Sequence, residues 1–104
     1  TNLYAMKVQG EAREAEEKAR VQRRKGAIVL IEHFLLENGY LQTLEKMQQE
    51  SGVSVQKLSV ADNISLTTVM QEFEEYFYVK FGRKPKFFRP VAGGDSAPAG
   101  AKGR

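Results

Sequence analysis

The residues that could support catalysis are few and far apart. His33 is the only histidine among 104 residues, and the chain has no cysteine, so neither a histidine cluster nor a thiolate metal site can form. Glu74 and Glu75 are adjacent, but neighbours on a helix point about 100° apart and would not face one substrate. The sequence has no G-x-x-x-x-G-K-[ST] phosphate loop. It therefore predicts a chain that is not an enzyme and holds no metal or cofactor.

Basic residues interleaved with aromatic ones form the better candidate for a contact surface. The segment KFGRKPKFFRP, residues 80–90, has this pattern, and a second basic run precedes residue 26. Such surfaces attract acidic partners and can stack on nucleic acid. The alternative is that the cations only solvate an exposed helix and tail. The candidate contact residues are Arg23, Arg24, Lys25, Lys80, Arg83, Lys84, Lys86 and Arg89.

The charge distribution favours the same two regions. Residues 1–26 carry seven Lys or Arg and four Glu, residues 27–79 carry two Lys and eight acidic residues, and residues 80–104 carry seven Lys or Arg and one Asp. The net charge of +3 therefore conceals an acidic middle between two basic ends. The longest apolar run, residues 27–31, is far shorter than the roughly 20 residues of a membrane span, so no membrane partner is expected.

The elements that would position these residues are three helices, and no strand is predicted. Residues 11–25 are rich in strong helix formers, and residues 27–37 continue as an apolar helix that ends at Asn38-Gly39. Residues 41–51 and 66–81 follow as a second and a third helix. We expect residues 1–26 to be a charged extension continuous with the first helix, residues 27–90 to be the domain, and residues 91–104 to be a flexible tail. The first residue is Thr rather than Met, which suggests a piece of a longer protein.

The first helix has more apolar surface than one neighbour can cover. Ile28, Ile31, Phe34 and Leu35 share a face at helical spacing, which Leu30 extends, whereas positions 29 and 36 lie well around the helix. A helix that is apolar over most of its circumference must be buried by several neighbours.

Two short helices cannot cover this surface by themselves. Burying a large apolar side chain contributes about 1.5–3 kcal/mol, while ordering the backbone costs about 1–2 kcal/mol per residue. The third helix is expected to cover one side. A second copy related by a two-fold axis would cover the other, giving a four-helix-bundle core with the third helices outside it. The alternative is that a different protein covers the remaining face. The predicted dimer interface comprises Ile28, Ile31, Phe34, Leu35, Tyr40, Leu44 and Met47.

The stretch LIEHFLLENGYLQTLEKMQQES, residues 30–51, resembles the LisH motif. The resemblance rests on an aliphatic residue, an aromatic-leucine pair and a Gly-Tyr turn, followed by four residues at the expected spacing: Ile31, Phe34, Leu35, Gly39, Tyr40, Thr43, Leu44, Met47 and Glu50. Met47 stands where the family more often has Phe. This resemblance implies an all-α dimerisation element that forms an antiparallel four-helix bundle.

Two further stretches resemble the N-terminal region of the katanin catalytic-subunit-like AAA ATPases that carry a LisH motif. These are VQRRKG, residues 21–26, and DNISLTTVMQEFEEYFYVKFGRKPKF, residues 62–87. In that family an ATPase domain, which this chain lacks, assembles as a hexamer and remodels or severs microtubules. The resemblance implies a regulatory and targeting module that dimerises. Its other partners would be tubulin, microtubules or katanin-type regulatory subunits.

The implied location is the cytoplasmic cytoskeleton, at microtubules, the centrosome or a basal body. Two other functions stay open. The chain could be the dimerisation domain of a centrosomal or ciliary LisH scaffold. It could also be a basic surface that binds tubulin or, less favoured, nucleic acid.

Overall fold

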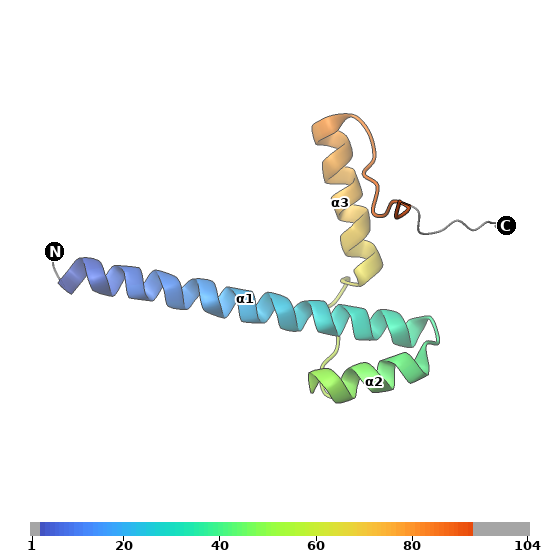
Figure 1. Ribbon diagram of the computed structural model, residues 1–104, viewed down its shortest axis with the longest axis horizontal. Helices are drawn as coiled ribbons and strands as arrows, with labels where there is room; N and C mark the ends of the chain where they lie inside the picture. Colours follow the sequence, from blue (N-terminus) through green and yellow to red (C-terminus); the bar gives the residue numbers. More distant parts are fainter. Residues whose placement is uncertain (1–2, 93–104) are drawn as a thin grey trace. The chain divides into compact units, whose positions relative to one another are not determined.

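The computed structural model describes residues 3–92, and within this range the chain is entirely helical. It forms α1 (Leu3–Glu37), α2 (Leu41–Ser51) and α3 (Leu66–Phe81), without a strand among the described residues (Figure 1). The prediction of an all-helical chain is therefore confirmed. Nearly all of the predicted tail, residues 91–104, lies outside the described residues.

By its internal contacts the chain divides after Val69 into two compact units. The first contains α1, α2, the connector between α2 and α3, and the start of α3. The second begins at Met70 and contains the rest of α3 and the segment that follows it. The predicted boundaries after residues 26 and 90, and the packing of a third helix against the first two, stay predictions.

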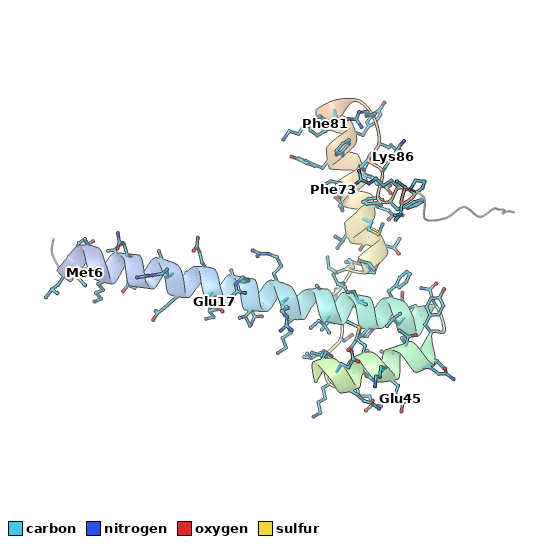
Figure 2. The ribbon with its side chains drawn as sticks, viewed as in Figure 1. Met6, Glu17, Glu45, Phe73, Phe81 and Lys86 are labelled. Atoms are coloured by element: carbon cyan, nitrogen blue, oxygen red, sulfur yellow. The ribbon has the colours of Figure 1, made fainter. Side chains whose placement is uncertain are left out.

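The first helix extends well beyond the hairpin that it forms with α2. It has 35 residues, which corresponds to a length of about 52 Å. Nearly all side chains before residue 28 are exposed, and Figure 2 shows Met6 and Glu17 on this projecting part. Arg20 and Glu17 form an ion pair of 2.5 Å on its surface. Exposed pairs of this kind contribute at most about 1 kcal/mol, so helix-forming residues sustain this part of α1.

The turn between α1 and α2 is fixed by backbone hydrogen bonds. Gly39 takes a left-handed conformation with a φ of 80°, as the sequence predicts for a glycine that ends a helix. The Gly39 N–H donates to the carbonyl of Leu36 at 3.2 Å, and the Tyr40 N–H donates to that of Leu35 at 2.9 Å. This pair of bonds defines a Schellman cap. It turns the chain sharply, so that α2 lies antiparallel beside the last turns of α1 (Figure 1).

The connector after α2 is hydrogen-bonded to the hairpin at two points. The His33 Nε2 lies 3.2 Å from the carbonyl oxygen of Leu58, and the Val55 N–H donates to Oε1 of Gln48 at 3.0 Å. Residues 53–60 therefore lie over the hairpin. His33 itself is half-buried between α1 and this connector.

Candidate protein-interaction surfaces

The interior that α1 and α2 form together is small. Among the described residues only Val29 and Leu44 are buried hydrophobic side chains, and the buried charged residue Glu32 lies beside them on the inner side of α1. A two-helix unit with so little apolar interior gains little free energy from its own packing. Most of its apolar side chains therefore remain partly in contact with solvent.

The contacts within the chain use one side of α1. Val29, Glu32 and His33 face α2 and the connector, because the first two are buried and the third bonds to Leu58. A residue two positions further along a helix points about 200° away. Ile31 stands in that relation to Val29, and Phe34 to Glu32, so each points away from that inner residue. Leu35 is three positions from Glu32 and lies about 60° from it, at the border of the side used within the chain.

The structure leaves the predicted interface residues in two different situations. Ile31 is 37% exposed and Tyr40 is 56% exposed. Four more of the predicted interface residues are half-buried and so keep part of their surface exposed: Ile28, Phe34, Leu35 and Met47. Leu44, by contrast, is only 6% exposed and already belongs to the interior of the hairpin. Six of the seven residues thus have surface left for a partner, and the role of all seven in a dimer stays a proposal.

The position of Val29 differs from the one predicted. The sequence placed Val29 off the main apolar face, and it is instead one of the two buried hydrophobic residues. The reason is that the connector lies against this side of α1, where Val29 lines a surface hollow together with Leu58, Val60 and Ala61. Because this stretch of α1 is apolar nearly all round, its periodicity does not show which side the rest of the chain covers.

Glu32 is a feature that sequence reasoning missed. Its side chain is fully buried, and one carboxylate oxygen, Oε2, accepts a hydrogen bond from the Ser51 hydroxyl at 3.2 Å. The Ser51 oxygen in turn accepts from the Val53 N–H at 3.1 Å. The other carboxylate oxygen, Oε1, has no hydrogen-bond partner among the described residues. This short chain of bonds links the middle of α1 to the end of α2. The sequence feature that could have indicated this buried carboxylate is the single acidic residue within the otherwise apolar stretch IVLIEHFLL.

The second unit is organised around aromatic side chains. On α3 the ring centroids of Phe73 and Phe77 are 5.8 Å apart, and those of Phe77 and Phe81 are 4.5 Å apart. After α3 the chain turns at Gly82 and runs back beside the helix (Figure 2). There the ring centroid of Phe87 lies 6.0 Å from that of Phe73. Phe73 and Phe81 are themselves about half exposed. This aromatic cluster therefore holds the chain after Gly82 against α3, but it does not form a buried hydrophobic core.

The predicted cationic contact residues are all exposed, but they are not equivalent. Lys80 lies over the rings of Tyr76 and Phe81, at 5.5 and 5.7 Å from their centroids, and the Arg83 guanidinium lies 5.4 Å from that of Phe77. These two cations are engaged by the protein's own aromatic rings. The others project into solvent: Arg23, Arg24, Lys25, Lys84, Lys86 and Arg89. Their role toward an acidic partner stays a proposal.

The described part of the chain contains no group of three or more His, Cys, Asp or Glu residues that could hold a metal ion. Within the same range, no helix combines the length and the hydropathy needed to cross a membrane.

The comparison with known proteins points to one kind of relative. The chain is 38% identical over 95 residues to the katanin p60 ATPase-containing subunit of A-like 2 type from Xenopus tropicalis, and equally to that from Xenopus laevis. Each match covers 91% of this chain but only 18% and 19% of the two relatives. No profile of a known protein family matches the sequence, and neither does a solved structure. Nearly the whole chain is therefore homologous to a small part of a katanin p60 ATPase-containing protein of the A-like 2 type.

Proposed function

We propose that this chain is a non-catalytic homodimerisation module of the LisH type. The observation that carries the proposal is the two-sided character of α1. One side is used within the chain by Val29, Glu32 and His33, while the other retains exposed apolar surface at Ile31 and its neighbours. A second copy would bury that surface with the same residues.

The proposed interface is self-complementary and forms a four-helix bundle. Two copies of the hairpin, related by a two-fold axis, would place the outer faces of their α1 helices together, with Tyr40 at the turn and Met47 of α2 at the edge. The contact residues are Ile28, Ile31, Phe34, Leu35, Tyr40 and Met47. Leu44 supports them from the interior of each hairpin, where it is already buried.

The homology supports a role as the N-terminal regulatory region of a katanin-like microtubule-severing protein. The relatives are named as ATPase-containing proteins, and the chain spans less than a fifth of their length. In our proposal the ATPase domain lies elsewhere in the longer protein, and this module pairs two such proteins. It would act at microtubules, the centrosome or a basal body, together with tubulin or a katanin-type regulatory subunit.

The solution mass tests the proposed dimer. We expect sedimentation equilibrium between 1 and 100 µM to give twice the 11.7 kDa of one chain. The apolar side chains on the outer face of α1 stabilise the protein only when a second copy buries them. The dimer should therefore persist through most of this concentration range. A wild-type chain that is folded and sediments as a monomer at tens of micromolar would contradict the proposal.

A second candidate function rests on the exposed cations of α1. Arg23, Arg24 and Lys25 are consecutive and exposed on the projecting helix, where they could contact the acidic tails of tubulin. Such binding is electrostatic and falls steeply with salt.

Microtubule co-pelleting tests this candidate. We expect a variant with Glu at positions 23, 24 and 25 to pellet at least tenfold less than the wild type in low salt. The matched control, with Glu in place of Lys7, Arg13 and Lys18, changes the charge equally in the same exposed helix. Equal loss in the two variants would show that net charge alone, and not this site, drives the binding.

A further inference from the structure

The segment that follows α3 is held in place by a few side chains and leaves others free. We call residues 83–91 the basic aromatic segment. Phe87 rests on Phe73 with ring centroids 6.0 Å apart, and Arg83 lies over the ring of Phe77. These two contacts fix both halves of the segment against α3. The side chains between and beyond them are thereby displayed at defined positions.

Phe88 is a large apolar side chain of this segment, and it is 88% exposed. It lies between Lys86 and Arg89, and Lys84 is also exposed close by in sequence. Residues 76–92 contain no acidic residue that could neutralise these cations. Lys80 and Arg83 are engaged by aromatic rings. Lys84 lines a surface hollow together with Glu72, Glu74 and Glu75. Two exposed cations, Lys86 and Arg89, therefore flank one large apolar side chain that has no cover within the described residues.

We propose that the basic aromatic segment is a peripheral contact site for anionic lipid bilayers. Lys86 and Arg89 would pair with the negative headgroups, while Phe88 enters the boundary between headgroups and acyl chains. A flexible acidic polypeptide would neutralise the cations but would offer no apolar environment to Phe88. An anionic bilayer provides both features in one surface. This inference is independent of the proposed dimer, and it revises the expectation that the chain has no membrane partner.

The acidic residues of α3 do not oppose this contact. The segment lies against the side of the helix that carries Phe73. Glu75 is two positions further on and so points about 200° away, to the far side of α3, while Glu72 and Glu74 each point about 100° to the side. A bilayer that approaches the segment therefore meets Lys86 and Arg89 before it meets these carboxylates.

Vesicle co-sedimentation tests the proposal with the full chain. We expect binding to vesicles of phosphatidylcholine with 30% phosphatidylserine, and none to phosphatidylcholine alone. Each cation near a charged membrane surface contributes about fivefold in affinity, so the double variant Lys86→Gln/Arg89→Gln should bind about 25-fold more weakly. Phe88→Ser should reduce the affinity by about tenfold, since it removes the apolar group that is buried on binding.

Two control variants match these changes in kind. Arg13→Gln/Lys18→Gln removes the same charge from exposed positions of α1, and Val79→Ser removes an apolar side chain that is 84% exposed on α3 but lies outside the segment. Both should bind within twofold of the wild type. Anionic vesicle binding that all four variants weaken equally would overturn the assignment of this segment. Binding to polyglutamate without binding to vesicles would overturn the lipid in favour of an acidic polypeptide.

Insertion of residue 88 can be measured directly, because the chain contains no tryptophan. Phe88→Trp introduces a single reporter at a position so exposed that the fold should not change. On anionic vesicles its emission should shift to shorter wavelength, and brominated acyl chains should quench it. A vesicle-bound chain whose emission stays at the solvent-exposed wavelength would overturn the insertion of this side chain.

Discussion

Phe34→Asp is expected to convert the dimer into a monomer. Phe34 points away from the side of α1 that packs within the chain, so in our proposal it lies near the centre of the interface. A two-fold dimer of this variant would bury two new carboxylates without partners, and burying an unpaired charge costs several kcal/mol. We expect the free energy of dimerisation to fall by at least about 4 kcal/mol, or about a thousandfold in Kd. Sedimentation should then give the mass of one chain at 100 µM.

The variants for this experiment must separate loss of the dimer from loss of the hairpin. Ile31→Asp serves this purpose, because Ile31 is 37% exposed and is not part of the interior between α1 and α2. It should give a monomer whose helical circular dichroism stays near that of the wild type. Val21→Asp is the matched control, since Val21 is exposed on α1 outside the hairpin. Either interface variant sedimenting as a full dimer would contradict the proposed interface.

The helix boundaries could be predicted because local chemistry determines them. Gly39 and Gly52 both have φ values near +80°, a conformation that glycine adopts without steric cost. Ser65 directly precedes the third helix, and its hydroxyl oxygen accepts a hydrogen bond from the Thr68 N–H at 3.1 Å. Each of these features depends on a few neighbouring residues, all of which are visible in the sequence.

The side of α1 that meets α2 could not be predicted, because it depends on residues distant in sequence. Periodicity identifies a buried face only where polar residues mark the opposite one, and residues 27–36 include only Glu32 and His33 as polar positions. Those two residues lie on the inner side, bonded to Ser51 and Leu58. Polar residues normally indicate the solvent-exposed side of a helix, so these two residues indicated the wrong side.

The same limit applies to the cations of the second unit. Lys80 follows Tyr76 by four residues, a spacing that brings two side chains together on a helix, and its Nζ donates to the Tyr76 hydroxyl at 3.0 Å. Arg83 reaches Phe77 only because the chain turns at Gly82. The sequence thus grouped five cations as one surface. The structure separates Lys80 and Arg83, which lie over aromatic rings, and Lys84, which lies near acidic residues of α3, from the exposed pair Lys86 and Arg89.

The buried carboxylate of Glu32 leads to the second large effect that we expect. Glu32→Leu should stabilise the folded chain by about 2 kcal/mol in urea-induced unfolding. The carboxylate has one neutral donor, the Ser51 hydroxyl, and its Oε1 has no partner among the described residues. Leaving a buried polar group unpaired costs about 1–3 kcal/mol, and replacing a buried charge by an apolar side chain of similar volume is often stabilising. Leu also has a similar helix propensity, so the backbone should not oppose the change.

Two further variants locate the origin of that gain. Glu45→Leu makes the same change at an exposed position of α2 and should alter the unfolding free energy by no more than about 0.5 kcal/mol. Ser51→Ala leaves the carboxylate in place without its one donor and should destabilise the chain by about 1–3 kcal/mol. A Glu32→Leu chain that is less stable than the wild type would show that a donor reaches Oε1 in solution.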